Sequence, residues 1–159
     1  MMVNIVPFQR EYATAFRDLN MAWLKEYFYI EPKDRMLLEH CQEHIIDKGG
    51  HIFIALIENR PVGCFSLIPI SAKIFELGKM AVSQENQGEG IGQQLLTFAI
   101  DFAKQRNWEK IILYSSTKLP SALYIYRKYG FKTVALEKNL PYARSDIKME
   151  LNLIPVIEK

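Results

Sequence analysis

The segment Met80–Leu96 constrains the fold more than any other part of the sequence, because Gly88, Gly90 and Gly92 fall within five positions between a strand-like run and a long amphipathic run. Glycines at such a junction let the backbone turn sharply and let a ligand approach it closely. The N–H groups that begin the following helix, with the positive end of its dipole, favour an anion. The segment therefore predicts a phosphate-binding loop between a strand and a helix.

Two common phosphate-binding patterns do not fit this segment. After Gly88 and Gly90, a dinucleotide-binding fingerprint needs a third glycine at the position that Gln93 occupies. A nucleotide P-loop needs Gly-Lys-Ser or Gly-Lys-Thr, and the segment contains no lysine. NAD, ATP and GTP are disfavoured, and a glycine-rich turn without any ligand stays open as the simplest alternative.

The apolar periodicity predicts a mixed α/β fold, with residues 1–159 forming a single domain. Helical spacing of apolar residues predicts helices over 11–28, 32–48, 90–106 and 120–129. Strand-length runs predict strands over 3–8, 52–58, 60–69, 75–82, 110–114, 131–137 and 146–153. The three strands between 52 and 82 follow one another as an antiparallel meander. The strand, helix and strand between 75 and 114 predict two parallel neighbours with a right-handed crossover.

Charge and hydropathy exclude several classes of protein. The chain carries 20 basic and 18 acidic side chains, a net charge of +2, which is too small an excess for a protein that binds by neutralising many phosphates. No apolar run approaches the roughly 20 residues that cross a bilayer, and the first residues lack a secretory pattern. We therefore expect no nucleic-acid or membrane partner and a cytoplasmic location. Cys41 and Cys64 lack C-x-x-C spacing and are predicted to be small core residues.

Three motifs occur in a specific order along the chain. Gln87–Gly92 has the form Q-x-x-G-x-G, it follows the strand-like Glu76–Val82, and it precedes Ala122–Phe131, which reads ALYIYRKYGF. A looser match lies in Tyr142–Leu151. Together these motifs resemble the GNAT superfamily of acetyl-CoA-dependent N-acetyltransferases. The resemblance implies an α/β fold with a central, mostly antiparallel seven-stranded sheet that contains a splayed parallel pair, flanked by about four helices.

The resemblance also implies where acetyl-CoA binds. In the family, the pantetheine arm pairs with the main chain of the strand before the loop, as an added β-strand would. A backbone N–H there can also hold the oxyanion. The cofactor-binding residues implied by position are Met80, Ala81, Val82, Gln87, Gly88, Gly90, Ile91, Gly92 and Gln93.

Two side chains are candidates for the proton transfers. Tyr126 aligns with the family's proton donor to the departing CoA thiolate, and a core tyrosine that only packs is the alternative. An acceptor ammonium must lose a proton before it attacks, and Glu76 is the first candidate for the general base, with a water chain as the alternative. Strict alternation along the strand would place Glu76 on the same face as Gly78, Met80 and Val82.

The acceptor site is less well defined by the sequence. Glu31, Tyr142 and Arg144 occupy regions that shape the acceptor pocket in the family, where an acid would attract an ammonium and an arginine would pair with a carboxylate. Glu89 replaces a basic residue of many relatives, so it should point outward or weaken binding. Leu119 replaces an asparagine that contacts CoA in many relatives. Pairing into homodimers is common in the family, so a homodimer is a further expectation.

Three functions compete on this basis. The first is an N-acetyltransferase that moves acetyl from acetyl-CoA to the primary amine of a small molecule, amino acid or peptide, by direct attack in a ternary complex and without a metal. The second is a catalytically weak CoA-binding regulatory module on the same fold. The third is a metallohydrolase built on His40 and His44, whose H-x-x-E-H pattern is short and often coincidental.

Overall fold

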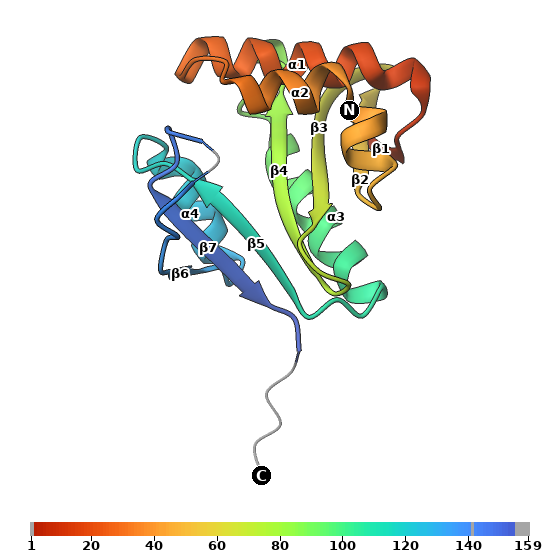
Figure 1. The fold of residues 1–159 in the computed structure, drawn as a ribbon. Helices are drawn as coiled ribbons and strands as arrows, with labels where there is room; N and C mark the ends of the chain where they lie inside the picture. Colours follow the sequence, from red (N-terminus) through yellow and green to blue (C-terminus); the bar gives the residue numbers. More distant parts are fainter. Residues whose placement is uncertain (1, 141, 155–159) are drawn as a thin grey trace.

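The computed structural model describes residues 2–140 and 142–154, which form one seven-stranded sheet with helices on both faces (Figure 1). The strands are β1 (Asn4–Pro7), β2 (His51–Ile57), β3 (Arg60–Pro69), β4 (Ile74–Val82), β5 (Lys110–Ser115), β6 (Lys132–Val134) and β7 (Ile147–Asn152). The helices are α1 (Ala13–Tyr27), α2 (Pro32–Glu39), α3 (Ile91–Gln105) and α4 (Pro120–Lys128), with 3₁₀ turns at Arg10–Tyr12 and Gln84–Asn86 and a π turn at Gln42–Ile46.

The strand order is β1-β2-β3-β4-β5-β7-β6. Strands β4 and β5 are parallel, and the other neighbouring pairs are antiparallel. The expected fold class, a mostly antiparallel seven-stranded sheet with one parallel pair, is confirmed. Both the meander β2-β3-β4 and the strand–helix–strand unit β4-α3-β5 lie where the sequence predicts them.

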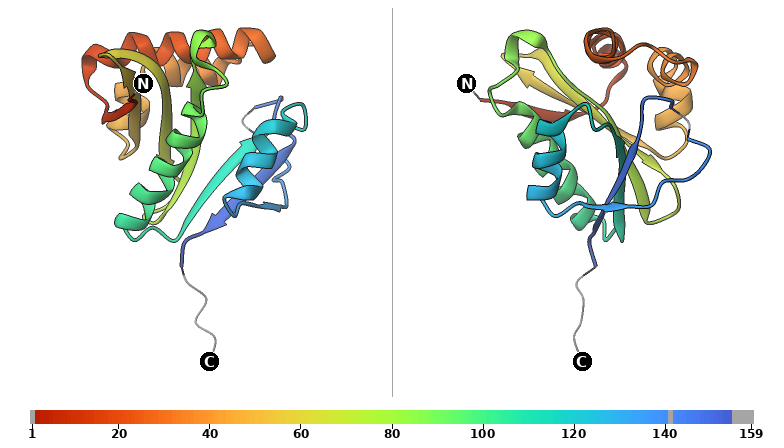
Figure 2. Two further views of the ribbon diagram at one scale, coloured as in Figure 1. Left: turned by 180° about the vertical axis from the view of Figure 1, so that it is seen from behind. Right: turned by 90° about the vertical axis from the view of Figure 1, so that its left-hand side faces the viewer.

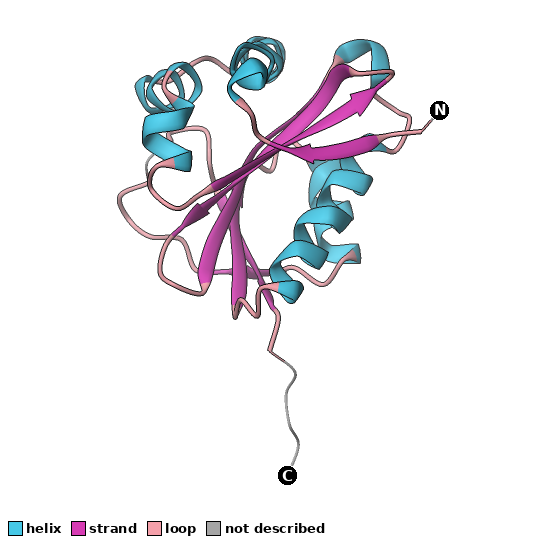
Figure 3. Ribbon diagram, turned by 90° about the vertical axis from the view of Figure 1, so that its right-hand side faces the viewer, coloured by secondary structure: helices cyan, strands magenta, loops and turns pink. Residues whose placement is uncertain are grey.

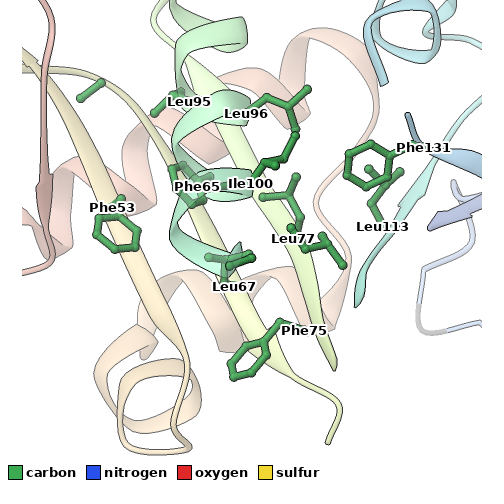
Figure 4. Close-up of a cluster of buried hydrophobic side chains, with 14 of the residues drawn as sticks. Phe53, Phe65, Leu67, Phe75, Leu77, Leu95, Leu96, Ile100, Leu113 and Phe131 are labelled. Atoms are coloured by element: carbon green, nitrogen blue, oxygen red, sulfur yellow. The ribbon is translucent and has the colours of Figure 1, made fainter. Parts of the chain in front are cut away.

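The sheet buries an apolar cluster on each face, because alternate residues of a strand point to opposite sides. In β2, Phe53 and Ala55 join the cluster beneath α3, whereas Ile52 and Ile54 join the cluster beneath α1 and α2. Figure 4 shows Phe53 among the side chains that pack between the sheet and α3. Seen from behind, α3 and α4 lie on the same face of the sheet (Figure 2). Burial on both faces explains why β2 reads as a continuous apolar run.

The sheet opens between β4 and β5. These strands pair only over Ile74–Glu76 and Lys110–Ile112, and beyond this short ladder they diverge into a V (Figures 1 and 2). Figure 3 shows helices on both sides of the sheet. Helices α1 and α2 cross the open end of the V. The second edge of β4, from Leu77 to Val82, consequently has no strand partner in the described part of the chain.

The predicted helix over 32–48 is wrong in one respect, because the α-helix is interrupted at His40. Its backbone leaves the helical region at φ −130° and ψ 46°, and a wider turn follows, in which the Asp47 N–H donates to the Gln42 carbonyl at 2.8 Å. Leu38 before the break and Cys41 after it are buried in the same cluster. The apolar pattern therefore continues across the break and gives no sign of it.

The predicted strand over 131–137 is also too long. Only Lys132–Val134 pairs with β7, and Glu137 lies outside the ladder, where it accepts a hydrogen bond from Tyr114 at 2.9 Å and contacts Lys148. An edge strand has one neighbour, so the apolar pattern does not determine where its pairing stops. Strand β2 ends one residue earlier than the predicted strand over 52–58. Glu58 and Asn59, with φ of 51° and 64°, form the turn between β2 and β3.

Candidate active site

A cavity of about 510 Å³ lies where β4 and β5 separate. It brings together residues from β4, from the glycine loop, from α4 and from the segment before β7. The nine residues expected to bind the cofactor all line it: Met80, Ala81, Val82, Gln87, Gly88, Gly90, Ile91, Gly92 and Gln93. Glu76, Tyr126, Tyr142 and Arg144 line it too, whereas Glu31 lies outside the lining. The fold thus gathers most of the candidate residues around one space.

The glycine loop leaves its backbone open towards this cavity. Gly88 and Gly90 have φ of 83° and 81°, a left-handed conformation that side chains rarely adopt, and Gly90 is the residue that precedes α3. A Cβ added at Gly88, Gly90 or Gly92 would meet no protein atom within 4 Å. The first N–H groups of α3 have no partner within the helix. Their position at the cavity wall, with the positive end of the helix dipole, suits a pyrophosphate.

Strand β4 contains a bulge next to the cavity. Ser66 of β3 faces Gly78, and Cys64 faces Ala81, so one more residue lies on β4 than on β3 between these two pairs. Lys79 lies within this stretch with a φ of 51°. Bulges of this kind bend a strand and increase its twist. The bulge occurs just beyond the point where β4 separates from β5.

The bulge changes which face each side chain of β4 occupies. Phe75 and Leu77 before it, and Met80 and Val82 after it, all pack in the cluster beneath α3. The expectation that Glu76 shares a face with Met80 and Val82 is therefore wrong. Strict alternation holds only within an uninterrupted strand, and the extra residue reverses it.

Side chains of β3 support the bulge. The Ser66 hydroxyl donates to the Gly78 carbonyl at 3.1 Å, and the Cys64 thiol donates to the Lys79 carbonyl at 3.5 Å. Asn20 of α1 donates to the Cys64 sulfur at 3.3 Å. Cys64 is a buried core residue, as expected, and burial raises its pKa to about 12, so the thiol remains protonated. No motif in the sequence indicates these polar contacts, because they depend on the bulge.

Glu76 points to the face covered by α1 and α2. The Glu76 Oε2 atom would lie 3.8 Å from a Cβ added to Gly78. The residue opposite Glu76 on β3 is Ile68. No side-chain hydrogen bond to Glu76 is formed within the described chain. Burial raises the pKa of Glu76 above its usual value, although the charges of Lys33 and Lys79 oppose this. A carboxylate with a raised pKa and a free lone pair is suited to accept a proton.

Tyr126 and Ala122 on α4 both line the cavity. The Tyr126 ring packs edge-on against Phe131 with 5.8 Å between ring centroids. Burial raises the pKa of Tyr126, so its hydroxyl keeps its proton at neutral pH. Tyr124, also on α4, is 69% exposed. Tyr129, the residue that follows α4, donates a hydrogen bond from its hydroxyl to the Gln93 side chain at 3.3 Å.

Five side chains form a network beside the cavity that we call the ionic cluster: Glu31, Asp34, Lys79, Tyr142 and Arg144. Arg144 donates through both terminal nitrogens to Asp34, at 2.7 and 2.8 Å, and also to Glu31 at 2.9 Å. Lys79 donates to Asp34 at 2.7 Å and to the Tyr142 hydroxyl at 2.8 Å. Glu31 and Arg144, which were expected to contact the acceptor, therefore contact each other.

The pKa shifts in the ionic cluster reflect burial opposed by neighbouring charges. Burial by itself would raise the pKa of Asp34, but hydrogen bonds from Arg144 and the charge of Lys79 lower it below its usual value. Burial lowers the pKa of Lys79, which the adjacent Asp34 carboxylate opposes. Burial also raises the pKa of Tyr142. The sequence does not single out Lys79 as a site residue, because a lysine in a predicted strand is ordinarily a solvated surface residue.

The two departures from the family pattern lie differently. Glu89 is exposed, lies outside the cavity lining and accepts a hydrogen bond from Asn86 at 3.4 Å. Leu119 lines the cavity and directly precedes α4.

His40 and His44 have ring centroids 6.3 Å apart, and within residues 2–140 and 142–154 no group of three or more metal-binding side chains occurs. None of the helices in the described ranges is long and apolar enough to span a membrane.

Sequence comparison finds one matching family model and several similar N-acetyltransferases. A family model described as an acetyltransferase (GNAT) domain matches residues 48–133, more than half of the chain. Human N-acetyltransferase 8B is 25% identical over 96 residues, which are 57% of this chain and 42% of the human protein. The matching rat N-acetyltransferase 8B segment covers 43% of that protein. The chain thus spans less than half the length of these curated relatives.

Structural comparison gives the same family. The crystal structure of an acetyltransferase of the GNAT family from Staphylococcus aureus Mu50 is 25% identical, with a TM-score of 0.84 over 96% of this chain and 100% of that chain. Spermidine N-acetyltransferase from Vibrio cholerae, solved with CoA and spermine, shares the fold at 22% identity, with a TM-score of 0.75 over 95% of each chain. By its sequence match and by its fold, the chain belongs to the GNAT acetyltransferase family.

Proposed function

We propose that residues 1–159 form a single acetyltransferase domain that moves an acetyl group from acetyl-CoA to a primary amine by direct attack in a ternary complex. The observation that carries the proposal is the shared cavity. One side of this space is formed by the glycine loop and the start of α3, and the other holds Glu76 on the face of α1 and α2. Tyr126 of α4 lines the same space.

The residues present fit acetyl-CoA. Backbone at Gly88, Gly90 and Gly92 is open where a pyrophosphate would approach, and no acidic side chain of the glycine loop lines the cavity. The unpaired edge of β4 from Leu77 to Val82 offers main-chain groups to the pantetheine arm, in the manner of an added strand. Acetyl-CoA supplies an activated acetyl group as a thioester. The assigned binding residues remain those that line the cavity from β4 and the glycine loop.

Glu76 and Tyr126 have complementary roles in this proposal. Glu76, directly or through water, accepts the proton that the acceptor ammonium must lose before its nitrogen attacks. Main-chain N–H groups of Met80–Val82 stabilise the negative charge that develops on the carbonyl oxygen. Tyr126 donates its hydroxyl proton to the sulfur that leaves with CoA. The raised pKa of each side chain supports its role, since Glu76 becomes a stronger base and Tyr126 stays protonated.

Relatives indicate the range of acceptors. A structural neighbour from Vibrio cholerae is a spermidine N-acetyltransferase, and the curated relatives are N-acetyltransferases. A small molecule, an amino acid and a peptide each carry the primary amine that the proposal requires. Pairing of two chains into a homodimer is part of the proposal that sedimentation or light scattering would test.

Two measurements on the same preparation test the function. Calorimetric titration with CoA measures cofactor binding, and free-thiol detection with acetyl-CoA and a panel of amines, amino acids and peptides measures turnover. We expect micromolar to millimolar CoA binding and thiol release that depends on the amine. Binding without amine-dependent release would favour the CoA-binding regulatory module instead. Absence of both would contradict the proposed cofactor as well as the proposed reaction.

A further inference from the structure

The cavity lining carries more positive than negative side chains. Of the described residues in the lining, Glu76 is the only acid, whereas Lys79 and Arg144 are both cations. A substrate with several ammonium groups needs several carboxylates to replace the water that it loses. The lining offers one carboxylate for one ammonium.

The acids of the ionic cluster do not change this balance. Asp34 is fully buried and bound to both Lys79 and Arg144, and Glu31 is bound to Arg144. The cluster thus holds two acids and two bases in contact, and neither acid lines the cavity. Because each carboxylate is already neutralised, neither attracts a second ammonium, and because both cations are paired, neither is free for an acceptor carboxylate.

Charges close to Glu76 also oppose a second ammonium. Lys33, Lys79 and Lys148 act on Glu76 as positive charges, and Glu137 is the negative charge among its neighbours. Glu137 in turn contacts Lys148 and accepts a hydrogen bond from Tyr114. Because Lys79 is paired with Asp34 and Lys148 with Glu137, the charge left over among these neighbours is the cation Lys33.

Apolar and aromatic side chains line the cavity on the face of the sheet that Glu76 occupies. Ile68 lies beside Glu76 on β3, and Leu37 of α2 and Tyr142 also line the cavity. Tyr27 and Phe28, at the end of α1, add two more rings to the lining. Such walls gain free energy from covering an alkyl or aryl group and gain none from a charged one.

We propose that the acceptor is a primary amine whose only charge is the reacting ammonium and whose body is an alkyl or aryl group. This inference rests on the proposed acetyltransferase function and narrows its substrate class. It excludes compounds with two or more ammonium groups, and free amino acids, as preferred acceptors. The lone carboxylate holds the ammonium, while Ile68 and the adjoining rings hold the apolar body.

Three acceptors of equal chain length test the inference: hexylamine, 1,6-diaminohexane and 6-aminohexanoate. Their reacting amines have similar basicity, so the remote group alone differs. We expect kcat/KM for hexylamine to exceed the value for each of the others by about tenfold or more, a difference of about 1.4 kcal/mol. A smaller margin, or a preference for either charged acceptor, overturns the inference and leaves the acetyltransferase function intact. Loss of transfer to every amine, with no CoA binding, instead removes the proposed function and the inference with it.

A variant of the wall tests the same inference from the protein side. Ile68→Thr keeps a β-branched residue in β3 but replaces apolar surface by a hydroxyl. We expect the ratio of kcat/KM for hexylamine to that for ethylamine to fall by about three- to tenfold, because the longer chain loses its apolar contact. Glu43→Gln on the exposed π turn is the matched control and should leave the ratio unchanged. A ratio unchanged in Ile68→Thr as well would overturn the placement of the acceptor body.

Discussion

Lys79 Nζ lies 2.7 Å from Asp34 Oδ1, and this contact ties the bulge of β4 to the first turn of α2 across 45 positions of sequence. The Lys79 side chain is 7% exposed and the Asp34 side chain is fully buried. Arg144 binds the second side of the same carboxylate. A buried acid between two cations thus joins β4, α2 and the segment before β7 beside the cavity.

The first prediction concerns the stability that Asp34 provides. Asp34→Asn leaves Lys79 and Arg144 buried without their shared carboxylate, so we expect the free energy of unfolding to fall by about 3–5 kcal/mol at pH 7. Glu39→Gln on the same helix removes an exposed pair with Arg35 and should cost less than about 1 kcal/mol. Urea unfolding at equilibrium measures both. Equal, small losses in the two variants would contradict the role given to Asp34.

The pH dependence of this loss follows from the lowered pKa of Asp34. The carboxylate contributes its stability in full above about pH 4, the pKa of an unfolded aspartate, and the contribution disappears as the pH falls through the lower folded-state pKa. The difference between wild type and Asp34→Asn should therefore be constant from about pH 5 to 7 and shrink in stronger acid.

The second prediction is that Glu76→Gln stabilises the fold. The pKa of Glu76 is raised by burial, so its charged form costs stability. That cost is absent below about pH 4, where the carboxyl is protonated in both states, and it is complete above the folded-state pKa. We expect unfolding of Glu76→Gln at pH 8 to require about 1 kcal/mol more than wild type, and the gain to vanish in acid. A loss of stability at pH 8 would indicate an unrecognised partner for the carboxylate.

The third prediction uses the same variant to test the general base. Glu76→Gln should lower the rate with amine acceptors chiefly below about pH 8, where the amine is mostly protonated, and less at higher pH. Initial rates from pH 6 to 10 at saturating acetyl-CoA measure this. A loss that is uniform with pH would point to positioning of the acceptor, and an unchanged rate would assign the proton to water or another group.

The fourth prediction concerns the proton donor. Tyr126→Phe removes one hydroxyl and keeps the ring that packs against Phe131. We expect kcat to fall by about 10² to 10⁴, or roughly 3 to 5 kcal/mol of barrier, with KM for acetyl-CoA within a few-fold of wild type. Tyr124→Phe, on the exposed side of α4, is the control and should keep wild-type turnover. Wild-type turnover in both, where chemistry limits the rate, would show that Tyr126 only packs.

The fifth prediction concerns the glycine loop. Gly92→Asp places a carboxylate in α3 where an added Cβ has no other residue packed within 4 Å, so the fold should be unaffected while CoA binding is lost. Gly92 is the better site than Gly90, whose φ of 81° would add backbone strain to the result. Calorimetric titration with CoA and a thermal melt separate the two effects. Wild-type affinity in a folded Gly92→Asp variant would move the cofactor site elsewhere.

The sequence by itself determined the order of helices and strands and the position of the glycine loop. Both depend on local features, namely the period of apolar residues and glycine's tolerance of left-handed backbone, as at Gly88 and Gly90. The three motifs from Glu76 to Phe131 also indicated the GNAT family, which the comparisons confirm.

Only the tertiary structure decided which side of the sheet each residue of β4 occupies. The extra residue near Lys79 reverses the alternation, and no local pattern distinguishes a bulge from a regular strand there. The structure also decided that Glu31 and Arg144 contact each other while Glu76 stays free. Such pairing depends on which distant segments meet, because a charged side chain reads the same in sequence whether solvent or a buried counter-ion neutralises it.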